Sequence, residues 1–131
     1  AYHPASSSAL PAAMPYALLI HEPRDRRGRR TREQGITEYD SMLRFGAALT
    51  ARGIHRGSDA LMPDAQGARV SRQDGRTTVV DGPFAESKEM IGGFFLIDVA
   101  TRAEAIAIAA ECPAAAWATV EVREIGTCHD Q

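Results

Sequence analysis

Two side chains of this sequence stand where they can move a proton, and each ends an apolar run. Asp81 follows a Val-Val pair and precedes a Gly-Pro turn, so its carboxylate can project into a pocket as a base or a hydrogen-bond acceptor. His21 ends the apolar run 15–20 beside Glu22, and an imidazole next to a carboxylate can titrate near neutral pH. Asp81 and His21 are therefore the candidate catalytic residues.

Both residues also have a structural interpretation, which the sequence leaves open. An Asp before a Gly-Pro dipeptide commonly caps the turn, which gives Asp81 a role in the backbone alone. A histidine at the end of a strand is often partly buried, with its ring nitrogens bonded to backbone groups, and His21 fits that description as well.

The other candidates contact a ligand and do not react with it: Phe84, Glu86, Trp117 and Tyr16. Phe84 is either a platform for a substrate or an apolar plug of the core or of a dimer interface. Glu86 belongs to a mixed-charge loop, which is also typical of a solvated surface with weak ion pairs. We expect a small-molecule pocket where Phe84 and Trp117 approach Asp81 and His21.

No sequence pattern predicts a metal, a cofactor or a covalent nucleophile. The four histidines lack the helical i, i+4 spacing of a zinc site. The serines have no nucleophile elbow, and Gly92-Gly93 leads into a strand, which favours a bulge over a phosphate loop. We therefore expect no metal and no cofactor.

Six arginines fall within residues 24–32, and no aromatic residue lies between them. Such a cluster can bind an anionic ligand, RNA or an acidic partner. Asp25 and Glu33 dilute its charge, so we favour the interpretation as a flexible, solvated loop. A mobile loop at this place can also act as a lid over a pocket lined by His21 and Asp81.

The composition describes an ordinary globular chain. Its 131 residues fit one domain, with 44% apolar and 24% charged residues and a net charge of −2. These values give no support for nucleic-acid binding, and no apolar run is long enough to cross a membrane. Cys112 and Cys128 form neither a disulfide framework nor a metal-ligand spacing, which indicates free thiols and a cytoplasmic location.

Apolar periodicity and capping signals predict the elements that must position these side chains. Thr37 and Asp40 approximate a capping box at the start of a helix, and Arg52-Gly53 ends it. Thr101 and Glu104 form a second capping box. The predicted strands are 15–21, 54–61, 93–99 and 117–125, and a loop covers 24–35. A hairpin pairs 68–72 with 76–80 around Asp74-Gly75. The second helix ends before Pro113.

This order, β-α-β, hairpin, β-α-β, predicts an α+β fold of the ferredoxin-like (split βαβ) type. Its antiparallel sheet carries two helices on one face. The other face needs a cover, and a second copy of the chain is the economical one, so we expect a homodimer. The expected organisation is a leader or arm at 1–13, one domain at 14–126 and a tail at 127–131.

The segment 81–89, DGPFAESKE, followed by GGFFLIDV at 92–99, closely resembles the signature of the YCII-related proteins of the DGPF branch. The opening strand, Ala103-Glu104-Ala105 and Val120-Glu121-Val122-Arg123 are also similar to that family. The resemblance implies a dimeric α+β barrel of ferredoxin-like protomers. Relatives of that fold include muconolactone isomerase-like enzymes and antibiotic-biosynthesis monooxygenases, which work without metals in a pocket between sheet and helices. Proteins of the DGPF branch are also often encoded beside extracytoplasmic-function sigma factors.

The sequence departs from the wider family at two positions. The family is described with a histidine in the first helix and an aspartate near its end, both taken as hints of catalysis. The corresponding places here fall near Met42 and Ala51, which cannot do that chemistry. The catalytic suggestion therefore does not transfer to this chain.

Three functions remain as hypotheses. The first is a small-ligand-binding protein with a regulatory role. The second is a cofactor-free enzyme of the isomerase or monooxygenase type that uses Asp81 or His21 for acid-base chemistry. The third is a dimeric interaction module that serves a sigma-factor system through its arginine-rich loop.

Overall fold

The computed structural model describes residues 14–128, so the predicted arm at 1–13 and the last three residues of the predicted tail lie outside it. In chain order, the helices and strands are β1 (Met14–Pro23), α1 (Arg26–Arg29), α2 (Arg32–Ala51), β2 (His55–Ala60), β3 (Ala68–Gln73), β4 (Arg76–Asp81), β5 (Glu89–Val99), α3 (Arg102–Glu111) and β6 (Thr119–Glu124). Two 3₁₀ turns, η1 (Asp64–Gln66) and η2 (Pro113–Ala116), complete the set.

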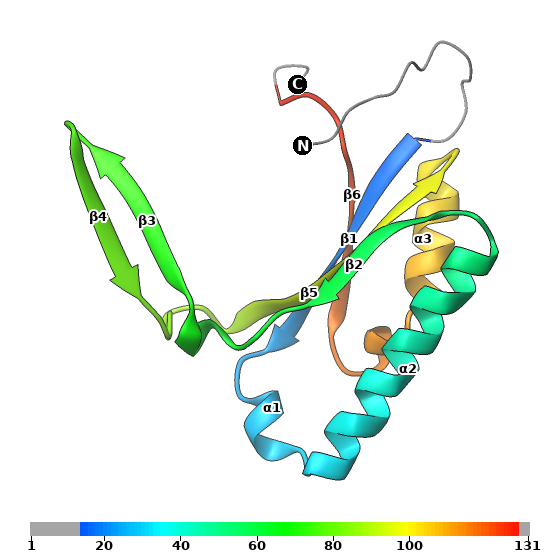
Figure 1. The fold of residues 1–131 in the computed structure, drawn as a ribbon, viewed down its shortest axis with the longest axis horizontal. Coiled ribbons are helices and arrows are strands. Elements are labelled where there is room, and N and C mark those ends of the chain that lie inside the picture. The colour runs from blue at the N-terminus through cyan, green and yellow to red at the C-terminus, as the bar shows by residue number, and fades with distance from the viewer. Residues whose placement is uncertain (1–13, 129–131) are drawn as a thin grey trace.

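Four strands form an antiparallel sheet in the order β2-β5-β1-β6, and α2 and α3 lie on one face of it (Figure 1). Each half of the chain leaves one strand position between its two strands, and the other half fills it. This is the split βαβ arrangement, so the predicted ferredoxin-like fold is confirmed.

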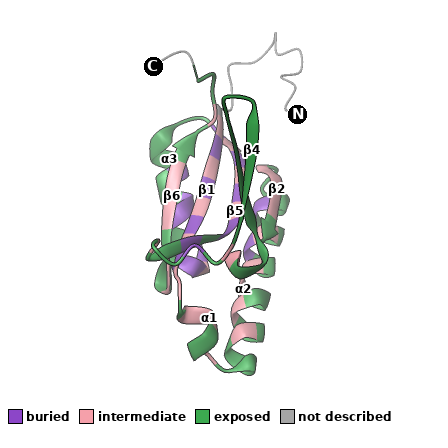
Figure 2. Ribbon diagram, turned by 90° about the vertical axis from the view of Figure 1, so that its left-hand side faces the viewer, coloured by how far each residue is buried: buried purple, intermediate pink, exposed green. Residues whose placement is uncertain are grey.

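The core lies between the sheet and the two helices. Leu18 of β1, Leu49 of α2 and Ile97 of β5 are the largest fully buried side chains. Along β1 and β5, buried residues alternate with half-buried ones, because successive strand residues face opposite sides of the sheet (Figure 2). One face of the sheet therefore carries the core, and the other stays partly exposed.

The N-cap of α2 lies six residues earlier than the sequence predicts. Thr31, not Thr37, is its N-cap: the Thr31 hydroxyl accepts from the Gln34 backbone N–H at 3.0 Å, and the Gln34 side chain accepts from the Thr31 N–H at 2.8 Å. This reciprocal pair satisfies two donors that a helix start leaves open. The predicted loop at 24–35 is therefore wrong over most of its length, because residues 26–29 form α1 and residues 32–35 belong to α2. The matching prediction for α3 is confirmed, with Thr101 and Glu104 in a capping box.

The predicted hairpin forms, but it does not join the main sheet. β3 and β4 make a separate two-stranded ribbon with all twelve strand positions exposed, and it projects from the sheet on the side away from the helices (Figures 1 and 2). Asp74 (φ 53°) and Gly75 (φ 78°) both adopt positive φ, as a tight two-residue hairpin turn requires.

A bulge interrupts the pairing of β1 with β5, as the glycine pair suggested. Ile20 lies opposite Gly93 and His21 lies opposite Ile91, so β5 has one residue more than β1 at this point. Beyond the bulge, Glu22 and Met90 face the helices while His21 and Ile91 face the other side.

Among the described residues, no helix is both long enough and apolar enough to cross a membrane.

Candidate functional site

A cavity of about 550 Å³ lies between α2 and the sheet. Side chains of β1, β2, β5 and α2 line it, and Trp117, which follows η2, closes one side. Ligand sites of soluble proteins are commonly concave spaces of about 300–1,000 Å³. The cavity therefore has the size of a small-molecule site.

The inner walls of the cavity are largely apolar. They include Ile20, Met42, Phe95 and Trp117. Phe95 is held by Phe45 of α2 in an edge-to-face contact with ring centroids 5.1 Å apart. A packed aromatic of this kind gives the cavity a firm wall.

His55 and Ser58 of β2 place a polar pair inside the cavity. His55 Nε2 and Ser58 Oγ lie 2.9 Å apart and share a hydrogen bond. In a regular strand, residues three apart face opposite sides of the sheet. The register shift between His55 and Gly57 brings this pair onto one side. Together they offer a donor and an acceptor to a ligand.

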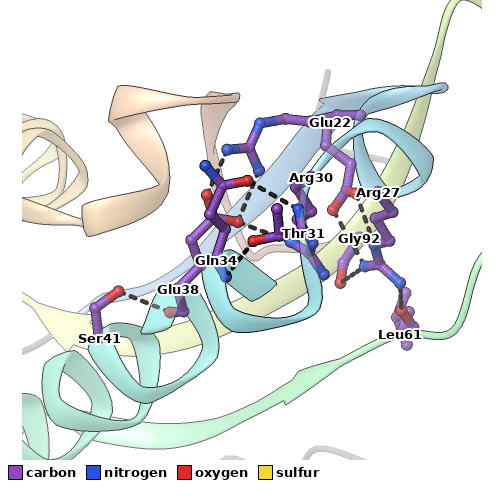
Figure 3. Close-up of polar contacts among 10 residues, drawn as sticks. Glu22, Arg27, Arg30, Thr31, Gln34, Glu38, Ser41, Leu61 and Gly92 are labelled. Carbon is purple, nitrogen blue, oxygen red and sulfur yellow. Dashed lines mark hydrogen bonds and ion pairs between the residues drawn. The ribbon is translucent and has the colours of Figure 1, made fainter. Parts of the chain in front are cut away.

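A buried ion pair lies at one end of the cavity (Figure 3). The Glu22 carboxylate is only 7% exposed and accepts from Arg27 at 2.7 and 3.1 Å. Arg27 also donates to the carbonyl oxygens of Leu61 (2.8 Å) and Gly92 (3.2 Å). Gly92 makes room for this pair, because a Cβ there would lie 1.9 Å from Glu22 Oε2.

A second carboxylate, Glu38 of α2, joins two arginines beside the cavity. It accepts from Arg30 Nη1 at 2.7 Å and from both terminal nitrogens of Arg26. Hydrogen bonds hold the pKa of Glu38 below its usual value of 4.5, and those from Arg26 contribute more than the one from Arg30. Arg26 also stacks on Trp117, with its guanidinium carbon 5.1 Å from the ring centroid. Glu38 therefore stays ionised at neutral pH and fixes this end of α2 to the loop.

The arginine-rich segment is consequently not a free, solvated loop. Four of its arginines (24, 26, 27 and 30) pair with carboxylates of β1, α2 and η1, and their side chains are only 22–27% exposed. Arg26 to Arg29 form the short helix α1. Three carboxylates, Glu22, Glu38 and Asp64, therefore balance about half of the positive charge of this segment inside the fold.

His21 faces the side of the sheet opposite the cavity. Its Nε2 lies 2.6 Å from Glu121 Oε1 of β6, and this hydrogen bond lowers the pKa of Glu121 below its usual value of 4.5. Arg123 bonds the same carboxylate at 3.2 Å. His21 therefore belongs to a polar cluster on the partly exposed sheet face.

Asp81 ends β4 and is exposed, and it does not line the cavity. Phe84 is 7% exposed and lies under the guanidinium of Arg69, 3.8 Å from its ring centroid. Glu86 is exposed and bonds Arg69 at 3.2 Å. These residues gather at the base of the ribbon, away from His21.

The turn at the base of the ribbon is an anchor. Arg24, which directly follows β1, and Asp64 of η1 form a two-pronged ion pair with both distances 2.7 Å, and Arg24 also donates to the Ser87 carbonyl. The bond from Arg24 lowers the pKa of Asp64 below 3.8. Gly82 precedes a cis peptide bond to proline, and a Cβ on it would lie 1.8 Å from the Asp64 carbonyl oxygen. The glycine is required because η1 packs directly on the turn.

Of the six predicted site residues, Trp117 alone lines the cavity. Tyr16 is 5% exposed and belongs to the core. The six are thus distributed over the cavity, the core, the open sheet face and the ribbon base. Their catalytic or binding roles remain predictions.

Sequence reasoning missed the polar residues that do line the cavity, chiefly Glu22, Arg27, His55 and Ser58. One signal was present in the sequence: Gly57 inside a weak strand marks the shift that turns His55 toward Ser58. No local pattern joins Glu22 to Arg27, because the pair depends on how α1 folds back on β1.

Within residues 14–128, no group of three or more His, Cys, Asp or Glu side chains is arranged to hold a metal ion.

Comparison with known proteins finds the same resemblance across the described chain. The family model of the YCII-related domain matches residues 14–128. An uncharacterized protein of Rhizobium meliloti (strain 1021) is 48% identical over 46 residues, which are 35% of this chain. The matched segment spans 37% of that relative's length.

Proposed function

Because this chain belongs to the YCII-related family, we propose that it uses the cavity between α2 and the sheet to bind a small, uncharged and largely apolar molecule. The match to the family identifies no ligand, so the chemistry of the ligand has to be inferred from the cavity. Met42, near the place of the family's helical histidine, forms part of an apolar wall.

The cavity itself is the observation that carries this proposal. Its volume of about 550 Å³ suits a drug-sized molecule, and its walls join apolar side chains to one polar pair. Several apolar side chains at the mouth are exposed, including Tyr39 (54%), Leu43 (55%) and Met62 (68%). Covering them with a ligand would remove apolar surface from water.

The charges around the cavity favour an uncharged ligand. Arg27 already pairs with Glu22, and Glu38 already pairs with both Arg26 and Arg30. An ionic group entering between them would have to break a pair that is partly shielded from water, at a cost of several kcal/mol. A hydroxyl or carbonyl group can instead bond His55 or Ser58 and leave both ion pairs intact.

A thermal-shift screen of uncharged aromatic and aliphatic metabolites tests the proposal. A ligand of the folded state raises the melting temperature by mass action. Ala47 lines the cavity and its neighbour Ala48 does not. Ala47→Phe should therefore abolish the shift of a hit, and Ala48→Phe should preserve it. Hits that survive Ala47→Phe, or that prove to be ions, contradict the proposed site or its ligand class.

One observation favours an enzyme as a second candidate. His55 is the histidine of the cavity lining, an imidazole that can accept or donate a proton, and Ser58 holds its ring. A ligand with an acidic C–H or O–H group beside His55 would have a general base within reach. This proposal places the proton transfer at His55, because Asp81 and His21 lie outside the cavity lining.

Incubating each screening hit with the protein separates binding from turnover. The wild type should convert a hit to a product if the protein is an enzyme. Support for catalysis at His55 would be that His55→Gln loses this conversion while it keeps the thermal shift. If a hit binds but is not converted to a product at any pH from 5 to 9, the binding function stands and the catalytic one is excluded.

The two cysteines bear on the location of the protein. Cys112 is buried and Cys128 is exposed, and neither is in a disulfide. Free thiols support the cytoplasm as the proposed location, because that compartment keeps thiols reduced.

A further inference from the structure

Ser58 places a hydroxyl group inside the cavity, beside a base. Its Oγ lies 2.9 Å from His55 Nε2, and both side chains line the cavity. An alcohol that donates its hydrogen bond to an imidazole becomes a nucleophile, because the ring takes the proton as the oxygen attacks. The hydroxyl of Thr50, also in the lining, donates instead to the Gly46 carbonyl at 3.0 Å, and a carbonyl cannot take its proton. Ser58 therefore has the partner that a nucleophile needs.

The aromatic wall of the cavity holds this pair in place. The His55 ring makes an edge-to-face contact with Phe95, with ring centroids 6.4 Å apart. Ser58 lies directly opposite Phe95 across β2 and β5, so both members of the pair stand against the same buried ring. Fixing both side chains keeps the hydroxyl and the imidazole at bonding distance before a substrate arrives.

Gly46 of α2 leaves the space in front of the hydroxyl open. A Cβ on Gly46 would lie 3.9 Å from Ser58 Oγ and 3.5 Å from the Phe95 ring, so a larger side chain there would occupy the approach to the hydroxyl. Glycine is, after proline, the residue type that a helix interior disfavours most. Its place inside α2 therefore favours access to Ser58 over the stability of the helix.

The backbone of Ser58 supplies a donor for the negative charge that forms during acyl transfer. The Leu61 N–H donates to the Gly92 carbonyl across β2 and β5, and pairs in an antiparallel ladder alternate between hydrogen-bonded and non-hydrogen-bonded. Ser58 stands three positions before Leu61, so it belongs to a non-hydrogen-bonded pair and its N–H points away from β5. Since β2 is an edge strand, no strand lies beyond it to take this N–H. An oxyanion formed on the nucleophile of the same residue can accept its hydrogen bond.

We propose that Ser58 is a catalytic nucleophile that, with His55 as its base, takes the acyl group of an uncharged ester. The inference rests on the proposed function, because the ester must enter the cavity with its apolar part against the walls. It goes beyond that function by naming the reaction, ester hydrolysis through an acyl-enzyme, and the atom that carries the acyl group.

Each step of this reaction balances with water as the co-substrate. Ser58 Oγ forms a bond to the carbonyl carbon while its proton passes to His55 Nε2 and the carbonyl electron pair moves to the oxygen. The C=O bond re-forms as the bond to the alcohol oxygen breaks, and His55 returns the proton to that alcohol. A water molecule then attacks the acyl carbon in the same way, which releases a carboxylic acid and restores the Ser58 hydroxyl.

The surroundings of His55 favour an ester with a good leaving group. In a serine triad, a carboxylate orients the histidine and stabilises its charged form. Among the described residues, no carboxylate is bonded to His55, and Ser58 is its hydrogen-bond partner. A leaving group that needs little protonation, such as a phenol, therefore suits this site better than an alkyl alcohol.

Acylation by p-nitrophenyl hexanoate, an uncharged aryl ester, tests the nucleophile. Protein quenched in acid during turnover should carry a hexanoyl group, and peptide mapping by mass spectrometry should locate it on Ser58. Ser58→Ala should lose this label and slow the release of p-nitrophenol at least about tenfold. Ser41→Ala is the matched control, because Ser41 of α2 lies outside the cavity lining and its hydroxyl bonds the Glu38 carbonyl. This variant should keep both the label and the rate.

The position of the label separates Ser58 from the other nucleophiles of the chain. A hexanoyl group on His55 or Cys128 without one on Ser58, or no hexanoyl group at all, would overturn the proposal. A rate of p-nitrophenol release that Ser58→Ala leaves unchanged would overturn it as well.

Failure of the nucleophile and failure of the cavity as a binding site give different results. Ala47→Phe fills the cavity and should abolish the label on Ser58 together with the thermal shift of a hit. Thermal shifts in a wild type that gains no label would leave the binding function and remove the nucleophile. A label on Ser58 that persists in Ala47→Phe would support the nucleophile and contradict the cavity as the ligand site.

Discussion

At the scale of single residues, glycines decide what the polar side chains can do. Gly92 leaves the space that the Glu22 carboxylate fills, and Gly82 leaves the space that η1 fills. Both were visible in the sequence as glycines of a distinctive segment. The sequence did not reveal their role, because each glycine is required by a residue far away in the chain.

Gly92→Ala should displace the Glu22–Arg27 pair, since the new methyl group would lie 1.9 Å from Glu22 Oε2. We expect a loss of about 1–3 kcal/mol in the free energy of unfolding, measured in urea, together with loss of ligand-induced thermal shifts. Gly126→Ala is the control, because a Cβ there meets nothing within 4 Å and Gly126 does not line the cavity. If the two variants are equally stable, Gly92 does not shape the ion pair.

The two thiols should differ sharply in reactivity. Cys112 is 2% exposed, and burial raises the pKa of its thiol above 9.0, so the reactive thiolate is scarce at pH 8. Cys128 is exposed. Ellman's reagent should modify one thiol at once and the second only after denaturant is added. Cys128→Ser should remove the fast phase, and a fast phase that persists in this variant would show that Cys112 is accessible.

At the scale of elements, the sequence predicts well wherever the signal is local. Asp74-Gly75 specifies a hairpin turn by itself, and Thr101 with Glu104 specifies a helix start. The start of α2 is different, because the sequence pattern points to Thr37 and the structure uses Thr31 as the cap. The helix runs through Gly35, where a Cβ would lie 3.0 Å from Arg30 Nε.

The two candidate caps of α2 can be separated experimentally. Thr31→Ala should lower the free energy of unfolding by about 1 kcal/mol, because it removes the hydroxyl that accepts from Gln34. Thr37→Ala should be neutral or slightly stabilising, since Thr37 lies inside the helix and alanine has the higher helix propensity. Chemical denaturation of both variants measures the difference. The reverse order of stabilities would restore Thr37 as the cap.

At the scale of the whole molecule, topology was predictable and the cavity was not. The alternation of strand and helix signals leaves few ways to form a sheet, and the ferredoxin-like order is one of them. The cavity depends on the distance between α2 and β2, on the shift at Gly57 and on ion pairs between distant elements. None of these is encoded in a short stretch of chain.

Ion pairs that join separate elements should make the protein sensitive to acid. Arginines hold the pKa values of Glu38 and Asp64 below 4.5 and 3.8, and His21 does the same for Glu121. A carboxylate whose pKa is lower in the folded state than in the unfolded state stabilises the fold at any pH above its unfolded-state pKa. This contribution is lost as the pH falls through the folded-state pKa. The melting temperature should therefore be nearly constant from pH 7 to about 5 and fall below that.

Glu38→Gln checks the contribution of one pair to this acid sensitivity. At pH 7 it should cost about 1–2 kcal/mol, because charged hydrogen bonds to two arginines are lost. The gap to the wild type should narrow as the pH falls, since protonation removes the same charge from the wild-type residue. A gap independent of pH would mean that the ionised form of Glu38 is not what stabilises the fold.

The ribbon is attached to the body only at its base, and it contributes no residue to the cavity lining. Mutations in the ribbon can change its exposed surface while the cavity lining stays as it is, and mutations in the cavity can change that lining while the ribbon is preserved. The two surfaces can therefore diverge independently in evolution. A duplicated gene could change one of them in a first step and the other in a later one.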